Sequence, residues 1–345
     1  MMRSARDTLI LGLLSACLCA PGGAQSAAYD MHDAAPGTGG AQQVPELYPG
    51  ESDDVGPQVV VTAKPARLHL ETMLDSQYYH TSNLFLTEDD PPFGPKVKGS
   101  EVLLSTVELA GSTDPVVMGE GEFQPRFGYR QQWYDFNLSD PSAFPPYDAN
   151  DLDFYAQTLF MEARYRYRKL WIFDGGFDWT QLSYTSGNSD FYSEVVPHFG
   201  VRRLIPLDDS RVITAGYQGA FYATNADTPL FTNISSNVND RVSHGVFVNY
   251  TQSITPKLIV QPYYRFKFTD YSHFENTFSQ PNARKDYLHS VGATLYYYIL
   301  PEISVRGFVN YDVNDSTADE SCCNGPVYDY KKLDAGVGIN LNYRF

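Results

Sequence analysis

One short segment holds residue types that could form a nucleophilic pair. In Tyr78-Tyr-His-Thr-Ser-Asn83, His80 and Ser82 are two residues apart, so both side chains would share one face of an extended strand. A serine nucleophile needs a neighbouring base that a third polar group holds in place. Glu101, on the next segment, is a weak candidate for that group. The alternative is a polar strand end that enters a loop, and we prefer it.

The His-x-Ser-Asn run resembles the outer-membrane phospholipase A and lipid A deacylase families, and the resemblance implies a lipid-facing His and Ser catalytic pair. The chain departs from the phospholipase pattern in two places. Leu84 follows the Asn where that family has Gly, and Gly94 stands where the family places its own Asn. We therefore expect no catalytic residues and no enzyme activity, and keep a hydrolase using His80 and Ser82 as the last alternative.

Charged residues at alternate positions form a second candidate set. If the strands close into a barrel, one face of each strand lines its interior, and this face would carry Arg126, Arg130, Arg164, Arg166, Arg265, Lys267, Glu122, Glu162, Asp174 and Asp178. Glu71, Glu108 and Arg202 fall on the same face. An antiparallel hairpin would set Arg126 opposite Glu162 and Arg166 opposite Glu122. Such pairs stabilise a narrow barrel. They also suit the wall of a selective pore, so both interpretations stay open, with conduction slightly favoured.

The elements that would position these residues show a period of two. Twelve segments alternate in this way, at about 67–79, 101–111, 117–135, 153–167, 170–184, 191–205, 211–224, 241–254, 257–271, 286–299, 302–314 and 329–345. Tight connections such as Thr113-Asp-Pro115 and Arg168-Lys169 alternate with mostly longer ones rich in Asp, Asn, Pro and Ser. Short turns at one end and long loops at the other are typical of an outer-membrane barrel.

The end of the chain adds a specific signal. Val337, Ile339, Leu341, Tyr343 and Phe345 share one face of an extended strand, and the intervening residues are polar or Gly. A terminal Phe with Tyr two residues before it resembles the recognition signal of bacterial outer-membrane barrels. This resemblance implies that Tyr343 and Phe345 form an assembly signal read by the barrel assembly machinery.

The chain divides into three regions. Residues 1–24 read as a secretory signal peptide, with Arg3 and Arg6 before an apolar run and cleavage after Ala24. Leu14-Ser-Ala-Cys17 is an alternative lipoprotein cleavage site. Residues 25–65 are rich in Gly, Pro, Ala and acids, and we expect a disordered periplasmic segment. Residues 66–345 form the expected barrel.

Composition limits the function. The net charge of −16 disfavours nucleic acid as a partner, because a phosphate-binding surface needs a basic patch. Many acids fall in the expected external loops, including Glu88, Asp148 and Glu320. Cys322 and Cys323 are adjacent and have too few neighbouring ligands for zinc, so a disulfide is the preferred interpretation. We expect no metal and no cofactor.

From residue 67 to 345 the chain resembles the porin-like outer-membrane β-barrels of Gram-negative bacteria, on the Ser82-Asn83 opening, the Tyr-rich strands and the Val337-to-Phe345 ending. The expected fold is all-β, a transmembrane antiparallel up-and-down β-barrel of about 12 strands in the outer membrane. The expected partners are membrane lipid and lipopolysaccharide, and an oligomer is left open. A narrow channel for small solutes is the first functional hypothesis, and a non-conducting envelope anchor is the second. The pattern names no solute.

Overall fold

The structure is a computed structural model, and it describes residues 68–84, 86, 99–138, 153–185, 190–226, 237, 239–271, 284–317 and 328–345. Its regular elements are the strands β1 (Leu68–Thr81), β2 (Ser100–Thr113), β3 (Val116–Met118), β4 (Gly121–Leu138), β5 (Phe154–Tyr167), β6 (Trp171–Tyr184), β7 (Asp190–Asp208), β8 (Arg211–Ala226), β9 (Arg241–Thr255), β10 (Leu258–Tyr271), β11 (Arg284–Leu300), β12 (Ile303–Ser316) and β13 (Tyr330–Arg344). The expected segments 1–24 and 25–65 lie outside the described residues.

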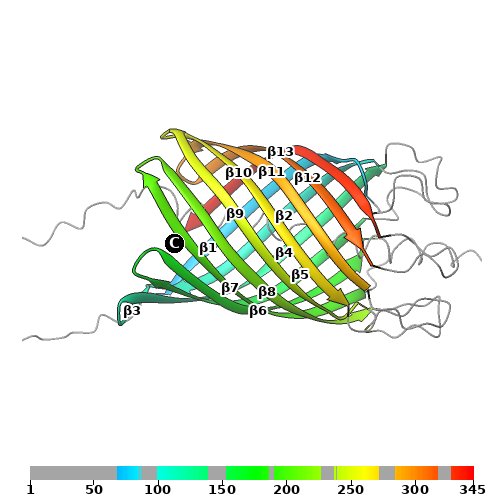
Figure 1. The fold of residues 1–345 in the computed structure, drawn as a ribbon, viewed down its shortest axis with the longest axis horizontal. Coiled ribbons are helices and arrows are strands. Elements are labelled where there is room, and N and C mark those ends of the chain that lie inside the picture. Colours follow the sequence, from blue (N-terminus) through cyan, green and yellow to red (C-terminus); the bar gives the residue numbers. More distant parts are fainter. Residues whose placement is uncertain are drawn as a thin grey trace, which may run out of the picture.

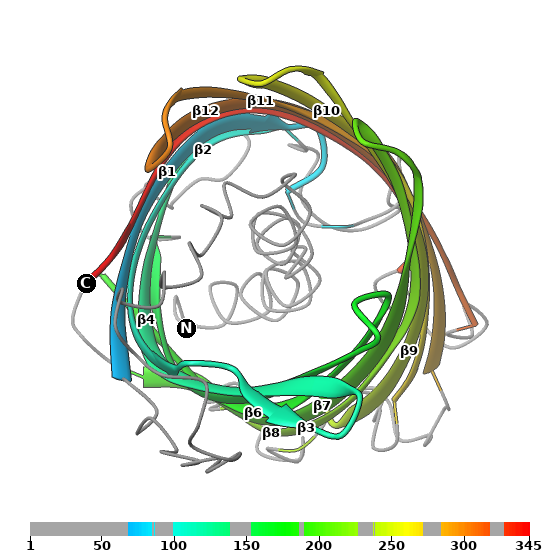
Figure 2. The same cartoon turned by 90° about the vertical axis from the view of Figure 1, so that its left-hand side faces the viewer.

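The strands close into a single antiparallel barrel. Each long strand pairs with its neighbours along the chain, β2 pairs with β4, and β1 pairs with β13 to complete the ring. Figure 2 shows this closure from one end, and Figure 1 shows the tilt of the strands. Apart from the three-residue β3, twelve strands of 14–19 residues form the wall. The sequence-based expectation of a twelve-stranded up-and-down barrel is confirmed.

The predicted start of the third strand was wrong. The periodicity predicted one strand over 117–135 after a turn at Thr113-Asp-Pro115, but the chain continues through Pro115 into β3 and turns at Gly119 and Glu120. Gly119 takes a φ of 63°, which suits glycine. Pro115 has no N–H for the ladder, and the pairing with β4 shifts by one residue between Ser112↔Arg126 and Val116↔Phe123. β3 therefore projects beyond the rim, at the end of the barrel where the chain terminates (Figure 1).

One face of the strands is exposed and apolar. The exposed large hydrophobic side chains stand at alternate positions, as in Leu70, Leu74 and Tyr78 of β1, or Val337 and Ile339 of β13. A contiguous apolar band around a closed barrel would be an aggregation surface in water and is the surface that a lipid bilayer requires. No helix in the described part of the chain is long and apolar enough to cross a membrane.

Glycine and aromatic residues pair across strands on the opposite face. Four lumen-facing glycines each stand directly opposite an aromatic residue on the next strand, namely Gly128 with Phe160, Gly216 with Phe247, Gly292 with Tyr263, and Gly336 with Tyr79. In each pair the aromatic side chain occupies the space where the glycine would carry a side chain. Glycine lets the sheet curve, and the ring restores the packing that glycine lacks.

Candidate functional site in the inner wall of the barrel

The charged side chains predicted for the lumen lie on the concave side of the sheet. They alternate with exposed apolar residues, as Arg126 does with Phe127 and Asp178 does with Phe177. Several of their contacts also span two strands, such as the ion pair between Arg126 of β4 and Glu71 of β1. Side chains that point into a barrel converge, whereas those outside diverge, so contacts of this span place the charges inside.

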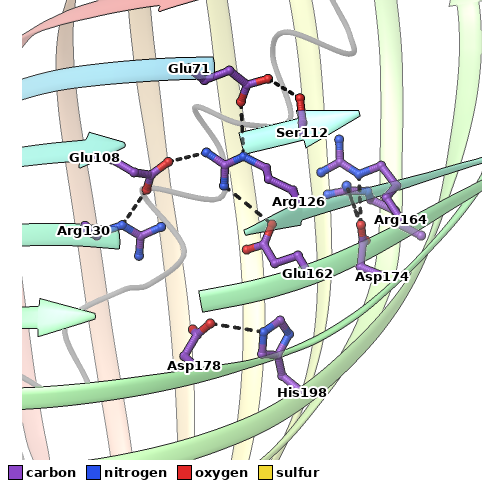
Figure 3. Close-up of polar contacts among 11 residues, drawn as sticks. Glu71, Glu108, Ser112, Arg126, Arg130, Glu162, Arg164, Asp174, Asp178 and His198 are labelled. Carbon is purple, nitrogen blue, oxygen red and sulfur yellow. Dashed lines mark hydrogen bonds and ion pairs between the residues drawn. The ribbon is translucent and has the colours of Figure 1, made fainter. Parts of the chain in front are cut away.

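Among the described residues, Arg126 is the centre of the largest ion cluster (Figure 3). Its guanidinium lies 3.3 Å from Glu71 Oε2 and 3.8 Å from Glu162 Oε2, and it also donates a hydrogen bond to Glu108. Ser112 Oγ donates to Glu71 at 2.8 Å. Residues from β1, β2, β4 and β5 thus meet at one guanidinium, and Arg126 links four strands of the wall.

Glu108 joins this cluster to a second arginine. Its side chain is 1% exposed, and it accepts a hydrogen bond of 2.7 Å from Arg130 Nε in addition to the one from Arg126. The two guanidiniums lie over the ring of Phe160, at 4.8 and 5.4 Å from its centroid. Cation–π contacts add to the ion pairs where water is excluded. One buried carboxylate and one ring therefore hold both arginines against the wall.

Further pairs continue the charged face along the next strands. Arg164 Nε lies 3.1 Å from Asp174 Oδ1, and Arg202 Nη2 lies 3.4 Å from the same carboxylate. His198 Nε2 and Asp178 Oδ1 face each other at 3.6 Å, which is too long for a hydrogen bond (Figure 3). Arg164 of β5 and Arg202 of β7 therefore share one carboxylate of β6.

A separate cluster fastens the seam where the barrel closes. Arg306 donates to Asp75 at 2.8 Å, and Asn340 donates to the other oxygen of Asp75 at 3.1 Å. Beside them, Lys332 lies between Asp334 at 2.8 Å and Asp312 at 3.4 Å. These contacts connect β1 with β12 and β13 on the inside, so the polar wall also stabilises the first-to-last strand pairing.

The structure brings most of the predicted wall residues together. Arg126, Arg130, Glu162, Arg164, Asp174 and Asp178 belong to the clusters above. Arg126 stands opposite Glu162, and Glu122 opposite Arg166, in the backbone register expected from the sequence. Of these, only Arg126 and Glu162 form an ion pair with each other among the described residues. Arg265 lies over the ring of Tyr263 at 4.7 Å. Lys267, on the same strand, lies apart from these clusters.

The alternating pattern of the sequence predicts Glu71, Glu108 and Arg202 on this face but does not predict their partners. Glu71 meets Arg126 across β2, and a contact across an intervening strand depends on barrel curvature, which a strand-by-strand pattern does not contain. His198 was not singled out at all. His198 lies at an even spacing from Glu194 and Arg202 on β7, and this spacing could have placed it on the inner face.

The possible nucleophilic pair lies on the outer face. His80 Nδ1 lies 3.0 Å from Glu101 Oε1, so the third group of the sequence pattern is present. Ser82 Oγ, however, accepts a hydrogen bond of 2.8 Å from the Leu333 N–H. No hydrogen bond joins Ser82 to His80 among the described residues. The geometry orients the histidine but does not supply the serine with its base.

The remaining predicted sites have mixed outcomes. Phe345 donates its N–H to Leu70 O at 2.8 Å, and its ring lies 4.8 Å from that of Tyr343. Both rings are exposed at the rim. Cys322 and Cys323 lie outside the described residues. Within the described ranges, no three His, Cys, Asp or Glu residues are grouped so as to hold a metal ion.

These features define a class of protein. A closed antiparallel barrel with an even number of wall strands, an apolar exterior and a charged interior is a transmembrane β-barrel of the outer-membrane type.

Comparisons with known proteins add three structural likenesses. An outer-membrane channel from Pseudomonas putida F1 is 12% identical over 86% of this chain and 100% of that chain, with a TM-score of 0.47. The β domain of the Bordetella autotransporter BrkA is 10% identical over 79% of this chain and 98% of that chain, with a TM-score of 0.44. The NanC porin is 10% identical over 78% and 98%, with a TM-score of 0.39. No family model and no curated protein matches the chain.

Proposed function

We propose that this barrel is a narrow, porin-like channel for small solutes. The observation that carries the proposal is the inner wall, where charged and amide side chains project into the barrel and Gln218 is exposed on that face. A barrel of twelve strands is wider than the eight-stranded kind that side chains can fill. Polar, water-exposed groups inside such a barrel favour a solvated path over a packed core.

The second candidate is a non-conducting envelope anchor. The interlocked ion pairs of Glu71, Glu108, Arg126 and Arg130 favour it, because each of these charges is held by another part of the wall. These four residues lie on β1, β2 and β4, however, and Lys267 on β10 lies outside this network. We therefore rank the channel first.

Single-channel recording in planar bilayers separates the two. The refolded protein should give small, stepwise currents, and a matched barrel denatured by boiling should give none. Absence of current from correctly folded protein would favour the anchor.

We propose further that the barrel has no lipid hydrolase activity. His80 contacts Glu101, but the serine lacks a hydrogen bond to the histidine. Purified protein in mixed phospholipid micelles should release no fatty acid, with or without His80→Ala. Lipid hydrolysis that is abolished by His80→Ala and also by Ser82→Ala would show that the barrel is a hydrolase and would contradict this proposal. Lipopolysaccharide and the barrel assembly machinery are its proposed partners.

A further inference from the structure

A row of directly paired residues crosses the inner wall from β6 to β10. Asp174 pairs with Gly200, Gly200 with Gln218, Gln218 with Gly245, and Gly245 with Lys267. Cross-strand partners share a face, so this row lies inside the barrel with Asp174. Gln218 and Lys267 therefore stand on either side of Gly245, two strand spacings or about 10 Å apart along the wall.

Gly245 leaves an uncovered gap between them. The heavy atoms nearest to a Cβ at this position would be two backbone oxygens, at 3.6 and 4.0 Å. Every other lumen-facing glycine in the described strands has a side-chain atom within 4 Å of that point, as Gly292 has from Tyr263 and Gly176 has from His198. The stretch formed by Gln218, Gly245 and Lys267, which we call the Gly245 gap, is thus the one place in the row without a covering side chain.

Lys267 brings an uncompensated charge to this gap. Among the described residues it makes no ion pair or hydrogen bond, and its cross-strand partners are Gly245 and Leu288. The nearest inward carboxylate on the adjacent strand is Asp286, which Arg284 already holds with two hydrogen bonds of 3.0 and 2.6 Å. Arg265 lies two residues earlier on the same face, over the ring of Tyr263.

The geometry points to an anion-binding step in the lumen, in which Lys267 and Gln218 hold the ionised acidic group of a small solute at the Gly245 gap. This inference rests on the proposed channel and names the class of solute that it retards. A carboxylate, sulfonate or phosphate bears oxygens that accept from an ammonium and an amide N–H at once. The missing side chain at Gly245 gives such a group access to both donors.

The paired arginines elsewhere on the wall restrict anion binding to Lys267. Arg126, Arg130, Arg164 and Arg202, on β4 to β7, have carboxylate partners, so an anion would need to displace an existing ion pair to bind them. Lys267 requires no such displacement. An anion passing through the barrel would therefore pause on the β8 to β10 side.

The test measures the local potential directly and does not depend on current. Gln218→Cys is introduced in full-length protein whose four native cysteines are changed to serine. Folded protein is treated at low salt with an anionic sulfonate thiol reagent or with a cationic ammonium one. The labelling rate of each reagent is measured in this Gln218→Cys protein and in the same protein with Lys267→Gln or Lys267→Arg added. Lys331→Gln is the control, because it removes one positive charge from the outer face.

The sulfonate reagent should label the introduced thiol roughly two- to three-fold more slowly after Lys267→Gln, as expected for one charge about 10 Å away in water-like surroundings. The ammonium reagent should react faster by a similar factor. Lys267→Arg and Lys331→Gln should leave both rates nearly unchanged. Equal effects of Lys267→Gln and Lys331→Gln, or no labelling in folded protein, would overturn the inference. If Lys267→Gln changes both labelling rates as expected but the barrel gives no bilayer current, the anion-binding step is retained and the channel is rejected.

Discussion

At the scale of single residues, the inner wall depends on a few buried charges that cannot be removed singly. Glu108 shows this most clearly, because one nearly inaccessible carboxylate serves two arginines. The charge pattern of the sequence located the face on which these residues lie. The partners could not be derived, since they depend on how far each side chain reaches across a curved sheet.

Glu108→Ala should destabilise the barrel by about 3–5 kcal/mol, because it leaves Arg126 and Arg130 buried without their shared carboxylate. The measurement is the urea concentration at which the folded form is lost on an unboiled gel. Glu122→Gln is the control, since Glu122 lies on the same face but forms no ion pair in the described part of the chain. Equal midpoints for the two variants would show that the cluster contributes little.

The glycines of the inner face should differ in their tolerance of a methyl group. Gly292→Ala would place a Cβ 2.5 Å from both the Tyr263 hydroxyl oxygen and the Val309 carbonyl oxygen. Such overpacking typically costs about 1–3 kcal/mol. Gly245→Ala meets only atoms at 3.6 Å or beyond and should be nearly neutral. Thermal melting of the folded form compares the two, and an equal loss in both would refute the pairing of glycine with its ring.

At the scale of elements, the period of two in the sequence predicts which segments are strands, and it predicts the ends of the strands less well. β13 was predicted at 329–345 and runs from Tyr330 to Arg344. The third segment was misjudged because an Asp-Pro pair is typical of a turn, whereas here it only interrupts the ladder before the true turn at Gly119. Alternation reports which face a residue occupies and does not report where pairing stops.

Removal of Phe345 should impair assembly more than folding. Its backbone N–H makes one hydrogen bond to Leu70, and its ring is exposed beside Tyr343, so little packing is lost in the finished barrel. In cells, the truncated chain should accumulate less in the outer membrane, while the purified chain should refold in detergent to nearly the same extent. Phe345→Tyr, which keeps an aromatic end, is the control. Failure of the truncated chain to refold in detergent would assign the residue a structural role instead.

At the scale of the whole molecule, the proposed function requires that the closed barrel conducts ions. The inner wall is close to electrically balanced, because most of its charges pair with one another. Much of the net charge of −16 must then lie elsewhere. Asp315 stands on the outer face of β12, and the acids assigned to external loops, such as Glu88, Asp148 and Glu320, lie outside the described residues. An acidic entrance would concentrate cations at low salt.

The reversal potential across a potassium chloride gradient, measured in planar bilayers, tests this claim most directly. We expect a small conductance with a weak preference for potassium, and this preference should fade as the Debye length falls toward about 3 Å near 1 M salt. Preference for chloride would mean that the arginines of the wall set the constriction despite their carboxylate partners. No current at all from barrels that are folded by the gel-shift criterion would contradict the channel.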